Sequence, residues 1–186
     1  MSKSFEDFKL NRQILNAVAD AGYTTPTPVQ EKAIMPILSG QDIMGIAQTG
    51  TGKTAAFVLP IIMQLKYAQG NDARALIIVP TRELAIQIEE NVKTFAKYTD
   101  LRTVLLYGGI GPKTQISELK KGVDLLISTP GRFLDLYLEG HINTQYLKFL
   151  VMDEADKMMD MASLDQFTES WRLYPEKGRI CFFQQQ

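Results

Sequence analysis

Eight residues, Ala47 to Thr54, form the segment of this chain with the clearest chemistry. They read Ala-Gln-Thr-Gly-Thr-Gly-Lys-Thr and follow a short apolar run, Ile43 to Ile46. A glycine-rich loop between a strand and a helix can surround a phosphate group with backbone N–H groups, because Gly50 and Gly52 adopt positive φ angles without a steric penalty. The N-terminus of the following helix adds a partial positive charge, so the segment has the properties of an anion site.

The same loop supplies two reactive side chains. Lys53 can reach the terminal phosphates of a nucleotide, and the Thr54 hydroxyl can ligate Mg²⁺. The segment departs from the usual pattern at one position, where Ala47 replaces the first glycine. Because the rest of the pattern is present between a strand and a helix, we predict a nucleotide-binding loop rather than a structural glycine turn. The residues expected to contact the nucleotide are Gln48, Thr49, Gly50, Thr51, Gly52, Lys53 and Thr54.

Two acidic residues, Asp153 and Glu154, follow the apolar segment Phe149 to Met152. An acidic pair at the end of a buried strand costs free energy unless a cation offsets it. Asp153 can hold Mg²⁺ opposite Thr54, directly or through water, and Glu154 can deprotonate the water that attacks a γ-phosphate. Alone, the pair would indicate only the acidic start of a helix. Beside the loop, we interpret Lys53, Asp153 and Glu154 as catalytic.

Composition limits the possible functions. The 186 residues fit one domain with a sizeable core, and 45% hydrophobic and 22% charged residues are ordinary for a soluble globular protein. The net charge of −1 gives no overall attraction to nucleic acid, so such binding must come from local patches and backbone contacts. The single cysteine excludes an intrachain disulfide. Without a signal peptide or an apolar run near ~20 residues, we expect a cytoplasmic location.

Strands and helices are expected to alternate along the chain. Between Thr81 and Tyr98, apolar residues recur at helical spacing, from Leu84 through Ile88 and Val92 to Phe95. This alternation predicts an α/β fold with a mostly parallel central sheet and helices on both faces. Ligands bind beyond the carboxyl ends of such strands, where the loop and the acidic pair fall. The expected buried strands are Ile43 to Ile46, Ala75 to Val79, Thr103 to Tyr107, Val123 to Ser128, Lys148 to Met152 and Arg179 to Phe183.

Six short elements between residues 5 and 157 resemble, in order and spacing, motifs of the DEAD-box RNA helicases. This resemblance implies a RecA-like domain of an RNA-dependent ATPase that uses ATP and Mg²⁺ and separates short duplexes locally. The six elements are Phe5 with Gly22 to Gln30 (Q motif), Ala47 to Thr54 (motif I in its helicase form), Pro80 to Ala85 (motif Ia), Gly108-Gly109, Thr129 to Arg132 (motif Ib) and Asp153 to Asp156 (motif II).

The Q motif has a physical interpretation as an adenine site. The amide of Gln30 has a donor and an acceptor that can pair with the N6 amine and N7 of adenine, so ATP should be preferred over GTP. Tyr23 or Phe5 could pack on the base or brace the loop, and ordinary core packing is the alternative for each. For Phe5 the two readings are evenly balanced. The resemblance suggests that Thr25 touches the base through its backbone.

Three elements are expected to bind RNA. Two of them end a strand and start a helix, so helix-start N–H groups, a threonine hydroxyl and a guanidinium form a phosphate site. The alternative is N-capping by Thr with Pro at the first helical position, and both roles can hold together. Such contacts bind the sugar-phosphate backbone of RNA and not its bases, so RNA sequence preference should be weak. The predicted residues are Pro80, Thr81, Arg82, Gly108, Gly109, Thr129, Pro130, Gly131 and Arg132.

The chain departs from the family pattern after Lys157. Gln184 to Gln186 stands where motif III, Ser-Ala-Thr, is expected, so the role of Asp156, which bonds to that motif in the family, is left open. We divide the chain into an N-terminal helical segment with the Q motif, residues 1–30, and a RecA-like ATP-binding domain, residues 31–186. The family's second RecA-like domain is expected in the full-length protein.

That second domain supplies an arginine finger, which can be worth a factor of ~10³–10⁵ in rate. We therefore expect this chain alone to be a monomer that binds adenine nucleotide weakly and hydrolyses it very slowly. The alternative is an ATP-gated RNA clamp or adaptor that does not unwind. An unrelated phosphate-loop ATPase, such as a transporter motor, would need neither Gln30 nor the two Thr/Pro/Arg sites.

Overall fold

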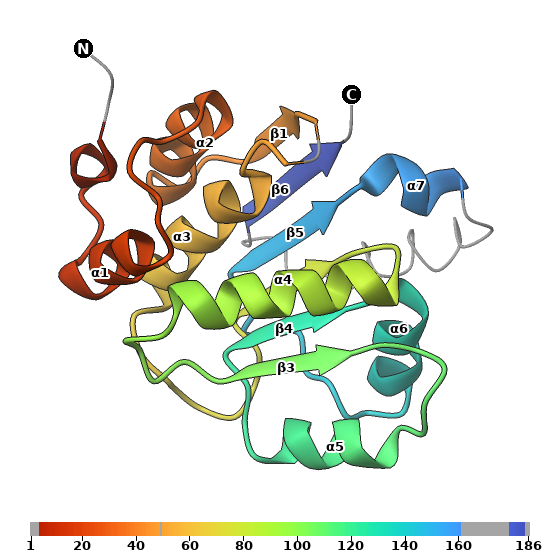
Figure 1. The fold of residues 1–186 in the computed structure, drawn as a ribbon. Coiled ribbons are helices and arrows are strands. Elements are labelled where there is room, and N and C mark those ends of the chain that lie inside the picture. Colours follow the sequence, from red (N-terminus) through yellow and green to blue (C-terminus); the bar gives the residue numbers. More distant parts are fainter. Residues whose placement is uncertain (1–3, 49, 161–178, 185–186) are drawn as a thin grey trace.

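The computed structural model describes residues 4–48, 50–160 and 179–184. Their centre is a sheet with the strand order β1-β6-β5-β2-β4-β3, in which every neighbouring pair is parallel (Figure 1). The predicted α/β class is confirmed. The strands are β1 (Ile43–Ile46), β2 (Ala75–Ile78), β3 (Thr103–Leu106), β4 (Leu125–Ser128), β5 (Phe149–Asp153) and β6 (Arg179–Gln184).

Helices cover both faces of this sheet (Figure 1). One hydrophobic cluster contains side chains of α1 to α4, and a second contains side chains of α5 to α7. The helices are η1 (Phe5–Phe8, a 3₁₀ turn), α1 (Arg12–Asp20), α2 (Pro28–Leu38), α3 (Lys53–Leu65), α4 (Arg82–Phe95), α5 (Lys113–Lys120), α6 (Pro130–Leu138) and α7 (Ala155–Asp160).

The buried central strands explain the two clusters. Successive side chains of a strand point to opposite faces. In β2, accordingly, Ala75 and Ile77 belong to the first cluster, whereas Leu76 and Ile78 belong to the second. All residues of β2 and β4 are buried, as expected for parallel strands between two helical layers.

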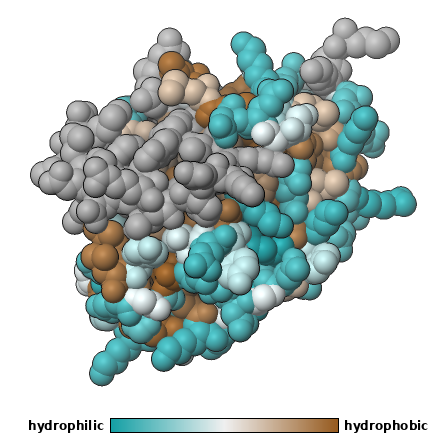
Figure 2. All heavy atoms as spheres, turned by 180° about the vertical axis from the view of Figure 1, so that it is seen from behind, coloured by the Kyte–Doolittle hydropathy of each residue, from teal (hydrophilic) through white to brown (hydrophobic). Residues whose placement is uncertain are grey.

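The edge strand β1 is less covered, with Met44 72% and Ile46 60% exposed. Figure 2 shows the face opposite to that of Figure 1, where hydrophilic residues form much of the visible surface and hydrophobic ones gather in smaller areas. None of the helices formed by the described residues combines the length and hydrophobicity needed to cross a lipid bilayer.

The N-terminal segment packs into the same core as the rest of the chain. Phe5 and Phe8 of η1 belong to the first hydrophobic cluster, together with Ile14 and Val18 of α1. The boundary proposed between residues 30 and 31 falls inside α2. The division into two parts stays a prediction, and its boundary would cut this helix.

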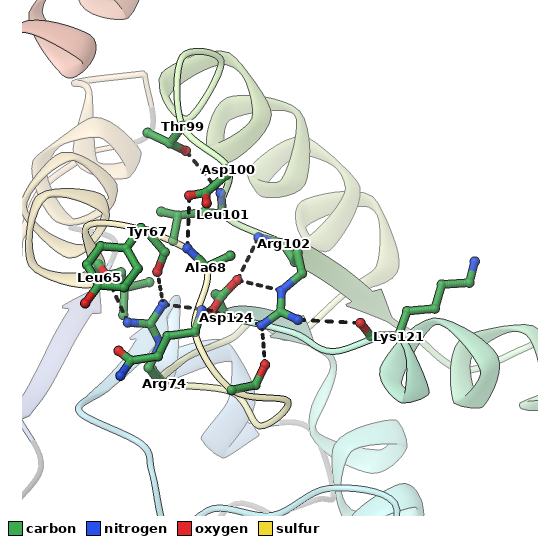
Figure 3. A network of polar contacts seen from close by, with 12 residues as sticks. Leu65, Tyr67, Ala68, Arg74, Thr99, Asp100, Leu101, Arg102, Lys121 and Asp124 are labelled. Atoms are coloured by element: carbon green, nitrogen blue, oxygen red, sulfur yellow. Dashed lines mark hydrogen bonds and ion pairs between the residues drawn. The ribbon is translucent and has the colours of Figure 1, made fainter.

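The carboxylate of Asp124, which directly precedes β4, is the centre of a buried polar network (Figure 3). It accepts hydrogen bonds from Arg74 Nη2 at 2.8 Å, from Arg102 Nε and backbone N at 2.9 Å each, and from Gln69 N at 3.0 Å. Arg74 directly precedes β2, and Arg102 directly precedes β3. The network therefore joins the amino ends of three neighbouring strands, at the edge opposite to their carboxyl ends.

The two arginines of this network also hold the connection between α3 and β2. Arg74 donates to the carbonyl oxygens of Leu65 and Tyr67, and Arg102 Nη2 donates to that of Gly70 (Figure 3). Burial alone would raise the pKa of Asp124, but the hydrogen bonds from Arg102, Gln69 and Arg74 hold this pKa below its usual value. Asp124 is therefore an ionised carboxylate at neutral pH.

Candidate functional site

The glycine-rich loop connects the carboxyl end of β1 to the amino end of α3, which begins at Lys53. Gly50 and Gly52 have φ angles of 79° and 86°, in the left-handed region that favours glycine. A Cβ atom at position 52 would lie 2.4 Å from Nε2 of Gln30. Glycine at this position is therefore required by both the backbone conformation and the available space.

Lys53 and Asp153 meet although they are far apart in the sequence. The Lys53 ammonium lies 3.7 Å from Asp153 Oδ1, and only 6% and 9% of the two side chains are exposed. The sheet order explains this contact, because β6 is the one strand between β1, which leads into the loop, and β5, which ends at Asp153. The loop and the acidic pair thus share one rim of the sheet.

Burial sets the electrostatics of the acidic pair. It raises the pKa of Asp153, whereas the charge of Lys53 lowers this pKa and Glu154 raises it. Glu154 has a φ of 56°, which is unusual for a residue other than glycine, and its N–H donates to Asp153 Oδ1 at 3.0 Å. Its carboxylate pairs with Lys157 Nζ at 2.8 Å, which raises the pKa of Lys157.

A cavity of about 310 Å³ opens at this rim. Side chains or backbone from α3, α4, the turn before α2 and the end of β5 surround it. It brings together residues from four of the predicted motifs, among them Leu84 of motif Ia and seven of the predicted nucleotide-site residues. These are Tyr23, Gly50, Gly52, Lys53, Thr54, Asp153 and Glu154.

The residues in this cavity fit a triphosphate with Mg²⁺. Among the described residues, Lys53 Nζ has no hydrogen-bond partner, although it is buried. An ammonium in this state is suited to donate hydrogen bonds to phosphate oxygens. Thr54 and Asp153 offer a hydroxyl and a carboxylate, the oxygen ligands that Mg²⁺ prefers. Their roles stay predictions.

One face of α4 also lines the cavity, which the sequence reasoning did not anticipate. Leu84, Gln87, Ile88 and Asn91 contribute to its wall. Their spacing of three and four residues is the periodicity of one helix face. Leu84 and Ile88 were assigned to the apolar core face, and Ile88 is indeed buried, whereas Leu84 is half-buried. Extending the apolar stripe to the polar Gln87 and Asn91 could have revealed this wall.

Phe5 is buried in the core and is not part of the cavity wall. Its ring meets those of Phe8 and Tyr23 edge to face, with centroids 6.0 and 6.3 Å apart. Tyr23 in turn meets Phe95 of α4 at 5.5 Å. In this arrangement Phe5 braces Tyr23, which does line the cavity. Contact between Phe5 and a base stays a prediction.

Other predicted nucleotide contacts lie elsewhere. Gln48 and Thr51 line a neighbouring groove of about 500 Å³ beside β1, and the Thr51 hydroxyl donates to the carbonyl of Gln48 at 2.7 Å. Thr25 is exposed in the turn before α2. Thr49 lies outside the described residues. Their contacts with a nucleotide stay predictions.

Gln30 is fully buried, and both atoms of its amide are bonded to the protein. Its Oε1 accepts from Thr27 N at 2.9 Å, and its Nε2 donates to the carbonyl of Gly52 at 3.1 Å. The Q motif is therefore tied directly to the phosphate loop. Recognition of adenine by Gln30 stays a prediction that requires the buried amide to become accessible to the base, either through its second N–H and second lone pair or by exchange of these partners.

Replacing Gln30 by Ala distinguishes the two roles. If the amide reads adenine, the variant should lose about tenfold in affinity for ATP and clearly less for GTP, because one base-specific hydrogen-bond pair is removed. Titrations of both nucleotides against wild type and variant measure this difference. An equal loss for ATP and GTP would assign Gln30 to bracing the loop alone.

The predicted RNA-binding residues lie in the loops that follow β2, β4 and β3 or in the first turns of α4 and α6, and these three strands are neighbours in the sheet. Thr81 precedes α4 and accepts a hydrogen bond from Leu84 N at 3.3 Å, so its capping role is present. Thr129 occupies the N-cap position of α6 without a side-chain cap bond, and Pro130 is the first residue of that helix.

The exposure of the remaining residues varies. Arg82, Gly108 and Gly109 are exposed, whereas Pro80, Gly131 and Arg132 are half-buried and Pro130 is buried. Gly109 has a φ of 82°. Contact with RNA stays a prediction for all nine positions.

Asp156 of α7 is the last residue of the predicted motif II. Its Oδ1 is enclosed and has no hydrogen-bond partner among the described residues. In the family resemblance, this carboxylate bonds to motif III, whose expected position is occupied by Gln184 and residues outside the described part.

A parallel α/β sheet with a glycine-rich loop, a buried lysine and two carboxylates at one rim defines a RecA-like domain of the phosphate-loop class. The family comparison is specific. The model of the DEAD/DEAH box helicases matches residues 27–183, and the chain belongs to this family.

Curated relatives agree with this assignment. The chain is 44% identical over 180 residues to the DEAD-box ATP-dependent RNA helicase RhpA of Helicobacter pylori, covering 97% of this chain and 36% of the relative. It is 41% identical over 183 residues to the ATP-dependent RNA helicase dbp10 of Schizosaccharomyces pombe, covering 98% of this chain and 22% of the relative. For DeaD of Haemophilus influenzae, the identity is 41% over 181 residues, with 97% and 29% covered. The chain thus spans little more than a third, or less, of these relatives.

Proposed function

We propose that this chain is the ATP-binding domain of an RNA-dependent ATPase that, in the whole protein, couples ATP hydrolysis to RNA binding and local duplex unwinding. The observation that carries this proposal is the contact between Lys53 and Asp153 inside a cavity at the carboxyl rim of the sheet. Family membership and three relatives named as ATP-dependent RNA helicases support it.

Each residue of the rim has a role in this proposal. Lys53 holds the terminal phosphates, and Thr54 with Asp153 holds Mg²⁺, which would offset phosphate charge. Glu154 accepts the proton of the attacking water. Lys157, paired with the Glu154 carboxylate at 2.8 Å, restrains the position of that base. Tyr23 and Gln30 stand on the side where the base would lie, because both come from the Q motif next to Gly52.

RNA is proposed to bind along the neighbouring rim formed by the loops after β2, β4 and β3. Two helix starts and a glycine turn there offer backbone N–H groups, hydroxyls and two guanidinium groups. Such groups recognise phosphates and not bases. The proposal also includes a weak RNA sequence preference, a monomeric state, a cytoplasmic location and, in the full-length protein, a second RecA-like domain.

ATP turnover with and without single-stranded RNA tests this function, on this chain and on the full-length gene product. We expect RNA to stimulate turnover by the full-length protein, and this chain alone to be slower by a factor of ~10³ or more, because the arginine finger is proposed to come from the second RecA-like domain. Turnover by this chain alone at the rate of the full-length protein would contradict the proposed need for a second domain. ATP-dependent RNA binding without strand separation by the full-length protein would favour the alternative, an ATP-gated RNA clamp or adaptor.

A further inference from the structure

The loop of residues 107–112, between β3 and α5, is bonded to α5 through the side chain of Gln115. Because β3 is an edge strand, it has a neighbouring strand on one side only. The backbone N–H of Tyr107, the first residue after β3, donates to Gln115 Oε1 at 3.1 Å, and its carbonyl accepts from Gln115 Nε2 at 3.2 Å. Gln115 is only 5% exposed, so this two-point contact is shielded from water.

This contact depends on the chemistry of an amide. A glutamine side chain offers a donor and an acceptor together, whereas an ionised glutamate offers acceptors only and methionine offers no donor. Gln115 therefore pairs with Tyr107 as a neighbouring strand would. The direction in which the Tyr107 side chain leaves the backbone is thereby fixed.

The ring of Tyr107 supports Arg82 at the start of α4. The guanidinium carbon of Arg82 lies 4.6 Å from the ring centroid, within the range of a cation–π contact. Arg82 is exposed. A cation–π contact uses the charge of the guanidinium and none of its hydrogen bonds, so the N–H donors of Arg82 stay available for an anion.

The same loop also meets the second arginine of the rim. Nη2 of Arg132, on α6, donates to the carbonyl of Ile110 at 2.8 Å. Nη1 of Arg132 is enclosed without a hydrogen-bond partner among the described residues. One short loop thus contacts Arg82 through the Tyr107 ring and Arg132 through the Ile110 carbonyl. In Figure 1 the arrowheads of β3 and β4 point to the same side of the molecule, where α4 and α6 begin.

We propose that Tyr107, held by Gln115, is a positioning residue for RNA binding. It sets the place of the Arg82 guanidinium relative to Arg132, and hence the spacing of two phosphate contacts along one RNA strand. Tyr107 acts through Arg82 and contributes no charge itself. This inference depends on the proposed function, because it assumes that RNA phosphates bind at this rim.

The salt dependence of RNA binding tests the proposal, because its slope counts phosphate contacts. A short oligouridine, titrated into this chain with a non-hydrolysable ATP analogue over a range of salt concentrations, gives the slope of log K against log salt. Arg82→Ala should make this slope less steep by about 0.7, the value of one contact on a single strand. Tyr107→Leu should produce most of the same change although it removes no charge, with a loss of about threefold to tenfold in affinity. Tyr107→Phe retains the ring and should match wild type.

The double variant Tyr107→Leu with Arg82→Ala should bind no more weakly than Arg82→Ala alone, because both changes remove one contact. Additive losses in the double variant would overturn the inference, because the ring would then act on RNA independently of Arg82. A Tyr107→Leu variant with the wild-type slope would also overturn it, because no phosphate contact would then depend on the ring. If Tyr107→Leu lowers the melting temperature, Gln115→Met gives the same test without altering the ring. Failure of wild type to bind the oligonucleotide would overturn the proposed function, and this inference with it.

Discussion

Replacement of Lys53 by Ala is expected to abolish ATP binding by this chain, with a loss of at least about 100-fold in affinity. The Lys53 ammonium is buried, faces the cavity and has no hydrogen-bond partner among the described residues. Hydrogen bonds to charged groups contribute about 1.5–3 kcal/mol each, and the loss of such contacts to two phosphates accounts for a change of this size. Calorimetric titration with ATP and ADP measures it.

The same substitution should also change Asp153. Burial already raises the pKa of this carboxyl, and the charge of Lys53 is the main influence that opposes it. Without Lys53, the pKa of Asp153 rises further and the carboxyl protonates more readily. Mg²⁺ should therefore improve ATP affinity less in the variant than in wild type. Lys53→Met, which retains most of the side-chain volume, should behave as Lys53→Ala does, because both lose the charge.

A matched control removes the same charge outside the cavity. Lys93 lies on α4, its side chain is 62% exposed, and it pairs with Glu89 at 2.9 Å. Lys93→Ala should leave ATP affinity within about twofold of wild type, because exposed ion pairs contribute little. If Lys53→Ala also stayed within that range, the triphosphate would have to bind elsewhere.

The features that the sequence predicted well are local ones. Apolar runs such as Ala75 to Val79 mark buried strands wherever they occur, and the spacing of Gly50, Gly52 and Lys53 requires a turn followed by a helix. These patterns do not depend on distant parts of the chain. The family motifs extend this reasoning, because their order implies that separate loops share one rim of a parallel sheet. The strand order and the face to which each strand residue points come from the structure alone.

Long-range contacts of polar side chains could not be predicted in this way. The expected strand Val123 to Ser128 begins two residues later, at Leu125, because Asp124 turns into a network with two arginines. No local pattern marks Arg74 or Arg102 as its partners. Likewise, the sequence predicts adenine recognition by the amide of Gln30 but gives no sign of its hydrogen bond to the Gly52 carbonyl, 22 positions away.

Replacement of Asp124 by Asn is expected to destabilise the fold by about 3–5 kcal/mol, because it removes the one anion that two arginines share in a buried site. The asparagine amide would also place a donor against guanidinium donors. For a domain of this size, we expect a melting temperature about 10 °C below that of wild type. Thermal and denaturant unfolding of the two proteins measure the difference.

The effect of this substitution should depend on pH. The folded-state pKa of Asp124 is below its usual value, which is about 3.9 in unfolded chains. The ionised carboxylate therefore contributes its full stabilisation above pH ~4 and loses it as the pH falls through the folded-state pKa. The gap in unfolding free energy between wild type and Asp124→Asn should be constant near neutral pH and should narrow in acid below pH ~4. A gap that widened in acid would contradict the assignment of an ionised Asp124.

Asp20 provides the comparison that separates burial from ion-pair geometry. Its carboxylate pairs with Lys97 Nζ at 2.8 Å, the same distance that joins Asp124 to Arg74, but the Asp20 side chain is 47% exposed. Asp20→Asn should leave the melting temperature nearly unchanged, because water replaces the lost partner.

Asp124→Asn should leave ATP affinity unchanged below its melting temperature, because its network joins the amino ends of the strands, whereas the cavity lies at their carboxyl ends. A loss of affinity without a loss of stability would show that the two edges of the sheet are coupled.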